Sequence, residues 1–348
     1  MAVRDDKQTG ASATTTTRRL FRGVQRLFSS HEQRLIFAPS HSASFASQVA
    51  VSLGLELAQS EEREYERGEH KMRPTQDVRG RDVFVVESLC GDERASVNDK
   101  LCRLLFFIGA LKDAGAARVT ACLPYLAYAR KDRRTQPFDP VITRSVAAMF
   151  EAVRVDRVMA LDVHNESAFD NAFRCQSIRM DATATFADYY TQTGDRSKLV
   201  VASPDAGGFK RAQVLRDRFA EKLGRPVEFA FMEKRRAAGV VSGDVFTGAV
   251  AERDVLIFDD MIASGTTLLR ATAAAKRAGA RRVDVIATHA AFTPEAARLF
   301  EPGGPDAVIV SDSVALPQSF APWLSRSLHV VRIAPLIAAS IRQLEPPR

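Results

Sequence analysis

The chain has 348 residues, of which 46% are hydrophobic and 26% are charged, and its formal net charge is +7. This composition is ordinary for a globular protein, and the length suggests two domains. No uncharged apolar run approaches the roughly 20 residues that a membrane-spanning helix needs, so we expect no membrane segment. No basic tract interleaved with aromatic residues indicates nucleic acid, and an acidic small-molecule substrate accounts for the basic charge equally well.

The first 33 residues are rich in Thr, Ser and Arg and are predicted to form a disordered extension. They have some features of an organelle transit peptide, but Asp5 and Asp6 argue against that interpretation. The four cysteines have no metal-like CxxC spacing, so we expect reduced thiols and a cytoplasmic protein.

Two stretches of the chain repeat one pattern. RDVFVVESL begins at Arg81 and RDVLIFDDM at Arg253, and each is apolar and then acidic. The helix patterns that follow, from Leu104 and Leu268, are identical at nine of sixteen aligned positions. A strand, loop, helix and strand are therefore used twice. We predict an α/β fold with two similar domains related by duplication, each with a mostly parallel central sheet and ligands beyond the carboxyl ends of its strands.

The first domain is expected to span residues 34–180 and the second residues 181–333, because another strand, loop and helix begin at Leu199. The helix-like segment within residues 334–346 is predicted to pack back on the first domain.

Two strand ends in the first half carry polar residues. The segment PYLAYARKDRR combines aromatic side chains, which can flank a purine, with Arg130 and Lys131, which can grip a polyphosphate. The apolar run ending in LDVH places His164 at a strand terminus. That histidine is either satisfied locally or a ligand of a metal and a nucleotide phosphate.

In the second half, the turn SPDAGG places Asp205 where it can hold a magnesium ion or a sugar hydroxyl, or cap an ordinary turn. The cations of EKRR, from Lys234 to Arg236, are either a solvated surface run or a mobile cluster that neutralises a transferring phosphoryl group.

The segment RDVLIFDDMIASGTTLLR is the most informative. Its apolar strand runs into Asp259 and Asp260, which suit sugar hydroxyls, and its small and hydroxyl residues open a helix. A helix N-terminus with free N–H groups favours a phosphate. An ordinary strand-to-helix turn with a Ser or Thr cap is the alternative.

Together these segments resemble the ribose-phosphate pyrophosphokinases, and the resemblance runs from about Arg34 to Leu344. The strongest matches are PYLAYARKDRR, LDVH, SPDAGGFKRA, EKRR, DDMIASGTTL, ATHAAF and IAPLIAASIRQL. The loop departs from the family pattern at Ala263 and Thr266, and Lys131 and Arg67 replace a usual glutamine and aspartate.

The resemblance implies transfer of the diphosphoryl group of ATP to the C1 hydroxyl of ribose 5-phosphate with Mg²⁺, in a homo-oligomeric protein. It implies an ATP-side first domain and a ribose 5-phosphate-binding second domain. It assigns catalysis to Lys234 and Arg236, on a flexible loop, and metal binding to His164 and Asp205. The expected ATP-binding residues are Tyr65, Arg67, Gly68, Glu69, Arg130, Lys131 and His164. The expected ribose 5-phosphate-binding residues are Asp259, Asp260, Ala263, Ser264, Gly265, Thr266 and Thr267. The alternatives are a catalytically silent regulatory homologue and a phosphoribosyltransferase.

Overall fold

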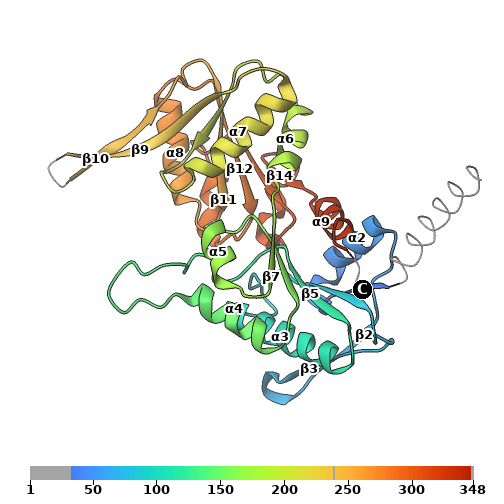
Figure 1. The fold of residues 1–348 in the computed structure, drawn as a ribbon. Helices are drawn as coiled ribbons and strands as arrows, with labels where there is room; N and C mark the ends of the chain where they lie inside the picture. Colours follow the sequence, from blue (N-terminus) through green and yellow to red (C-terminus); the bar gives the residue numbers. More distant parts are fainter. Residues whose placement is uncertain (1–32, 238–239, 346–348) are drawn as a thin grey trace, which may run out of the picture.

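The computed structural model describes residues 33–237 and 240–345 and shows two lobes, each built around a sheet (Figure 1). The predicted extension therefore lies almost wholly outside the described residues. The first sheet has the order β1-β4-β5-β6-β7, and all of its neighbouring strands are parallel. Its strands are β1 (Arg34–Phe37), β4 (Asp82–Val86), β5 (Arg118–Leu123), β6 (Arg157–Leu161) and β7 (Gln176–Met180). The helices of this lobe are α2 (Ala43–Leu53), α3 (Val97–Asp113), α4 (Ile142–Ala152) and α5 (Glu166–Ala172).

The second sheet has the order β10-β9-β8-β11-β12-β13-β14 and is parallel except for the β9–β10 pair. Its strands are β8 (Leu199–Ser203), β9 (Glu228–Ala237), β10 (Val240–Thr247), β11 (Asp254–Met261), β12 (Arg282–His289), β13 (Ala307–Ser311) and β14 (Leu328–Val331). The helices of this lobe are α6 (Thr183–Thr191), α7 (Phe209–Leu223) and α8 (Thr266–Arg277). The predicted α/β class with mostly parallel sheets is confirmed.

The repeated sequence pattern has the same structural role in both lobes. Asp82 and Asp254 are the first residues of β4 and β11, and both are buried. Arg118 Nε lies 3.0 Å from Asp82 Oδ1, and Arg281 Nε lies 2.8 Å from Asp254 Oδ1. Because each arginine follows the helix of its unit, the ion pair ties the start of one strand to the start of the next.

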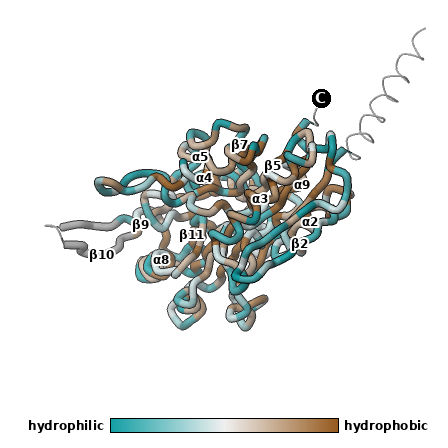
Figure 2. The backbone as a smooth tube through the Cα atoms, turned by 90° about the horizontal axis from the view of Figure 1, so that it is seen from below, coloured by the Kyte–Doolittle hydropathy of each residue, from teal (hydrophilic) through white to brown (hydrophobic). Residues whose placement is uncertain are grey.

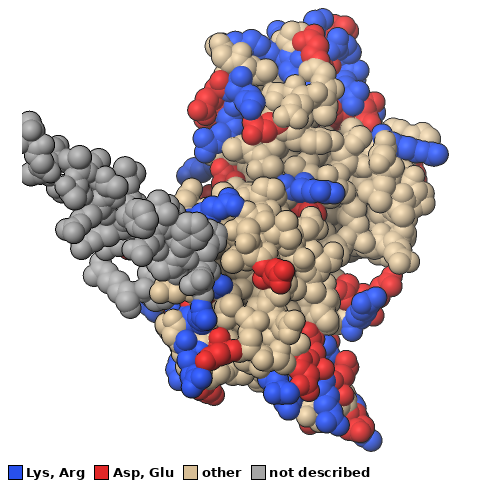
Figure 3. Space-filling model, turned by 90° about the vertical axis from the view of Figure 1, so that its right-hand side faces the viewer, with Lys and Arg blue, Asp and Glu red and all other residues tan. Residues whose placement is uncertain are grey.

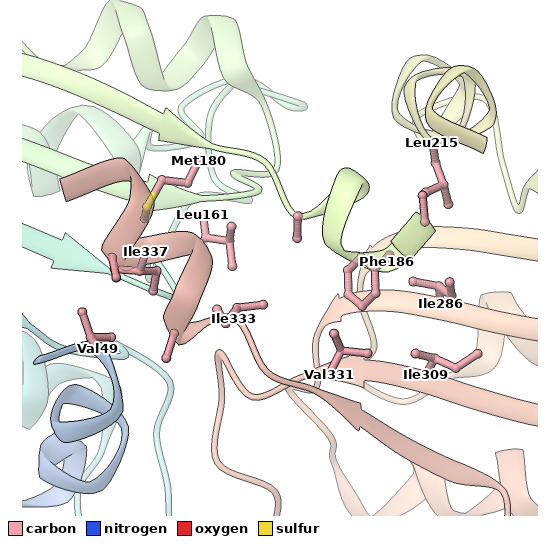
Figure 4. Packing of buried hydrophobic residues seen from close by; sticks show 14 of the residues in the cluster. Val49, Leu161, Met180, Phe186, Leu215, Ile286, Ile309, Val331, Ile333 and Ile337 are labelled. Atoms are coloured by element: carbon pink, nitrogen blue, oxygen red, sulfur yellow. The ribbon is translucent and has the colours of Figure 1, made fainter. Parts of the chain in front are cut away.

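The last helix, α9 (Ala334–Arg342), returns to the first lobe and lies against α2 (Figure 1). Figure 4 shows Ile337 of α9 and Val49 of α2 pointing toward each other within the central cluster of buried residues. The same cluster continues to Phe186 and Ile286 of the second lobe. The two lobes therefore share one apolar core at their junction. Two further clusters fill the opposite faces of the two sheets.

The remaining elements lie at the surface. A hairpin of β2 (Ser60–Glu64) and β3 (His70–Pro74) projects from the first lobe and is largely hydrophilic in Figure 2. The short 3₁₀ helices are η1 (Ser40–Ser42), η2 (Glu66–Gly68), η3 (Pro294–Phe300) and η4 (Gln318–Trp323). Within the described part of the chain, no helix has both the length and the apolar character that crossing a bilayer requires.

Candidate active site

A cavity of about 1090 Å³ lies where the carboxyl ends of β6, β8 and β11 approach one another across the lobe junction. The first lobe contributes Arg130, Asp132, Arg133 and residues 163–167. The second lobe contributes residues 205–207, Lys210, Arg211, residues 231–233 and the whole of residues 259–268. The crevice outside the carboxyl ends of parallel strands is the usual ligand position in such folds.

The loop between β11 and α8 forms one wall. Helix α8 begins at Thr266, and its N-terminus has no side-chain cap. Gly265 has a φ of +73°, and a Cβ at this position would lie 2.8 Å from Leu299 Cδ1, so any other residue would be strained and would have to displace Leu299. Ser264 Oγ lies 3.1 Å from Thr266 Oγ1. The loop thus presents hydroxyls and uncapped backbone N–H groups to the cavity, which is the arrangement that binds a phosphate.

The two aspartates after β11 differ in their surroundings. Asp260 Oδ2 lies 2.7 Å from His164 Nδ1, and Asp260 Oδ1 lies 3.3 Å from Arg211 Nη2. Burial alone would raise the pKa of Asp260, but the hydrogen bond from His164 and the charge of Arg211 outweigh it and hold the pKa below its usual value. Burial and the adjacent Asp260 charge raise the pKa of Asp259. Of the two carboxylates, Asp260 is therefore the one that remains ionised to lower pH.

The strand end that carries His164 is held by the second lobe. Asp162 has a φ of +40°, and its Oδ2 accepts a hydrogen bond from Thr288 Oγ1 at 2.5 Å. His289 Nε2 lies 3.2 Å from the carbonyl oxygen of Leu161. Burial lowers the pKa of His289 to about 4, so this ring is neutral near pH 7 and donates from Nε2. Burial and the nearby charge of Asp181 raise the pKa of Asp162 to about 7.

Asp205 lies in the turn that follows β8. Its Oδ1 accepts a hydrogen bond from the backbone N–H of Gly208 at 3.0 Å, and its backbone carbonyl accepts one from Ser203 Oγ at 2.7 Å. The turn is therefore fixed while Asp205 lines the cavity. Among the described residues, no three His, Cys, Asp or Glu side chains gather closely enough to hold a metal ion by themselves.

Most of the expected site residues line this one cavity. All seven residues expected to bind ribose 5-phosphate are there, together with Arg130, His164 and Asp205. Lys131 is not among the lining residues. Its backbone carbonyl instead accepts a hydrogen bond from the N–H of Thr143, at the start of α4.

The other four expected ATP-binding residues lie elsewhere. Tyr65, Arg67, Gly68 and Glu69 occupy the tip of the β2–β3 hairpin and do not line the cavity. The Arg63 guanidinium lies over the Tyr65 ring, 4.7 Å from its centroid. Within one copy of this chain, the structure does not bring the hairpin tip together with the rest of the predicted site.

Lys234 and Arg236 lie on β9, where they pair with Asp244 and Val241 of β10. A flexible loop was expected here, whereas the backbone continues as a hairpin next to Phe231, Met232 and Glu233, which line the cavity. Valine-rich sequence in β10 favours strand over loop. The side chains of Lys234 and Arg236 lie outside the described part of the structure.

Sequence reasoning missed the role of Arg211. Besides its carboxylate contacts, its Nη1 donates to the carbonyl oxygen of His164 at 3.0 Å, so it joins the two lobes. The signal available was its position: Arg211 lies on the first turn of α7, three residues after Gly208 of the paired glycines. Asn165 was also missed, and its Nδ2 donates to Asp132 Oδ2 at 2.6 Å.

Comparison with known proteins agrees with the fold. Residues 34–153 match the N-terminal domain of ribose phosphate pyrophosphokinase, and residues 172–302 match the phosphoribosyl transferase domain. The ribose-phosphate pyrophosphokinase of Haemophilus influenzae is 32% identical over 318 residues, which is 89% of this chain and 95% of that protein. The enzyme of the same name from Vibrio parahaemolyticus is 34% identical, with the same coverage of both proteins.

Among solved structures, the phosphoribosylpyrophosphate synthetase of Mycobacterium smegmatis aligns with a TM-score of 0.79 and 29% identity. The alignment covers 89% of this chain and 98% of that one. The similarity thus spans both lobes. The chain belongs to the ribose-phosphate pyrophosphokinase family.

Proposed function

We propose that this protein transfers the terminal diphosphoryl group of ATP to the C1 hydroxyl of ribose 5-phosphate, giving phosphoribosyl diphosphate and AMP. The C1 oxygen attacks the β-phosphorus, the bond from that phosphorus to the α,β-bridging oxygen breaks, and the hydroxyl proton is released. The observation that carries the proposal is that one cavity is lined by both lobes. The loop between β11 and α8 forms one wall, and Arg130 of the first lobe lies on the opposite side of the junction.

Ribose 5-phosphate is placed by the second lobe. Its phosphate binds the N-terminus of α8 through residues 263–267, and Asp259 receives its hydroxyls. The triphosphate is placed by Arg130 and His164, with Lys234 and Arg236 brought over it from the β9–β10 hairpin. Positioning and electrostatic stabilisation are the main contributions in such transfers, and each supplies several kcal/mol.

The donor set fits Mg²⁺. The described lining of the cavity contains more carboxylates than cationic side chains, so a triphosphate is accommodated best together with metal cations. Mg²⁺ is typically bound by one or two carboxylates plus substrate phosphate oxygens, which explains why no complete protein cage is needed. Asp205 and His164 are the residues that would hold it. When bound, the ion supplies charge neutralisation on the polyphosphate.

We further propose that copies of this chain assemble. Figure 3 shows a face whose middle is mostly uncharged and carries only scattered charged patches, while charges gather more densely at its upper and lower ends. Helix α2 has no charged residue, and Val51 on it is 70% exposed. The molar mass measured by light scattering should be a multiple of 38.2 kDa. A mass of one chain at micromolar concentration would contradict this.

Phosphorus NMR of the pure protein with Mg²⁺, ATP and ribose 5-phosphate tests the proposed reaction. We expect AMP and a new diphosphate ester, and no AMP when ribose 5-phosphate is omitted. A silent regulatory homologue would form neither product, and a phosphoribosyltransferase would release pyrophosphate only from phosphoribosyl diphosphate and a nucleobase.

A further inference from the structure

Asp260 is the less accessible member of the aspartate pair, and both of its oxygens are engaged. Its side chain is 4% exposed, whereas that of Asp259 is 20% exposed. Oδ2 contacts His164 and Oδ1 contacts Arg211 at the distances given above. A carboxylate that is bound on both oxygens and almost fully buried is poorly suited to receive sugar hydroxyls.

The contact with Asp260 selects one tautomer of His164. An ionised carboxylate only accepts hydrogen bonds, so the ring nitrogen facing it, Nδ1, must carry the proton. In the neutral ring, Nε2 is then the nitrogen with a free lone pair. The His164 side chain is 35% exposed and lines the cavity, so this lone pair belongs to the part of the ring that remains available to a ligand.

The backbone around His164 is fixed from the same side. Arg211, Thr288 and His289 all belong to the second lobe, and they hold the His164 carbonyl, the Asp162 carboxylate and the Leu161 carbonyl respectively. His289 also lies beside the aspartate pair, because its carbonyl accepts the N–H of Ile262 at 2.9 Å. The strand end and the aspartates are thereby held in one arrangement across the lobe junction.

We propose that Asp260 is a positioning residue that acts through His164, fixing its Nδ1–H tautomer and its orientation from the opposite lobe, and that it does not contact the sugar. A metal-binding histidine commonly donates its other ring N–H to a carboxylate, and loss of such a partner costs roughly 10- to 100-fold in metal affinity or activity. The kinetic part of this proposal rests on the proposed function, whereas the tautomer does not.

Nitrogen-15 NMR of the histidine side chains in the ligand-free protein is the first test. The His164 signal is assigned by its loss in His164→Gln, and at neutral pH we expect protonation on Nδ1. In Asp260→Asn, the charged Arg211 requires the amide oxygen, so the amide NH₂ faces His164 and the proton should move to Nε2. Asp259→Asn is the matched control and should leave the His164 tautomer unchanged.

Steady-state kinetics with ATP and ribose 5-phosphate is the second test. Asp260→Asn should lower kcat roughly 10- to 100-fold and change KM for ribose 5-phosphate by less than about threefold, since no sugar contact is lost. In a His164→Ala background the same substitution should change kcat by less than about twofold, because residues that act as one unit are not additive.

Three results would overturn the proposal. The first is an Nε2–H tautomer of His164 in the wild-type protein. The second is an unchanged tautomer in Asp260→Asn together with a large rise in KM for ribose 5-phosphate, and the third is additive losses of kcat when Asp260→Asn is combined with His164→Ala. If the wild-type protein forms no AMP, the proposed function fails, while the tautomer measurements still decide the role of Asp260.

Discussion

Replacing Gly265 by alanine should destabilise the protein through two separable effects. The first is conformational, because Gly265 has a φ of +73°. The left-handed region costs a residue with a Cβ roughly 1–2 kcal/mol, partly offset by about 0.4–1 kcal/mol from the smaller entropy of the unfolded chain. The second is steric, because the new Cβ would lie 2.8 Å and 2.9 Å from two carbons of Leu299. Overpacking of this kind typically costs about 1–3 kcal/mol.

Gly54 provides a matched control. Its φ of +76° is nearly the same, but a Cβ there would meet nothing within 4 Å. Gly54→Ala should therefore lose only the conformational part, about 1 kcal/mol. In urea unfolding, Gly265→Ala should exceed it by about 1–3 kcal/mol. Equal losses in the two variants would show that Leu299 does not constrain the loop.

A double variant separates the steric effect from any other loss at the loop. Leu299 is fully buried, so Leu299→Ala alone should cost about 2–5 kcal/mol. Combined with Gly265→Ala, the total should be smaller than the sum of the single losses by about 1–3 kcal/mol, because the clash contributes to the Gly265→Ala loss but is absent from the double variant. Strict additivity would refute the reasoning.

Three further outcomes are expected. Thr288→Val leaves the Asp162 carboxylate without its hydroxyl donor and should lower the free energy of unfolding by about 1–3 kcal/mol. Thr288→Ser retains the hydroxyl and should leave the free energy of unfolding unchanged. Urea titrations of both variants measure the difference. Because burial lowers the pKa of His289 from 6.5 to about 4, the unfolded chain takes up a proton first as pH falls. Stability should therefore drop by about 2 kcal/mol between pH 7 and 5 through this residue, and His289→Asn should reduce that slope. Lys234→Ala should lower kcat far more than it raises KM for ribose 5-phosphate, and near-normal turnover would remove Lys234 from the catalytic assignment.

Local sequence was sufficient to predict the structure wherever the functional residues come directly after an apolar strand in the chain. β11 and the loop to α8 could be predicted because the buried strand, the two aspartates and the helix start are adjacent in the chain. The duplicated unit was visible for the same reason. Such segments fix both the fold class and one wall of the cavity.

Contacts between the lobes could not be predicted in this way. His164 and Asp260 are far apart in the chain, and no local pattern says that they meet. The same holds for Asp162 and Thr288. The backbone at Lys234 was mispredicted for a different reason. A cluster of cations suggests a solvated loop, but this segment forms a strand because it pairs with β10, which comes later in the chain. The conformation of this backbone therefore follows from strand pairing and cannot be inferred from the charges of the segment.

The docking of α9 on α2 has a consequence for how the protein is made. During synthesis, the apolar side of α2 emerges early, and its covering helix follows only after almost all of the second lobe. Until then Val49 and its neighbours remain open to water or to chaperones. The amino-terminal half should accordingly fold only partly on the ribosome. It should become resistant to proteases late, after α9 with Ile337 has been synthesised.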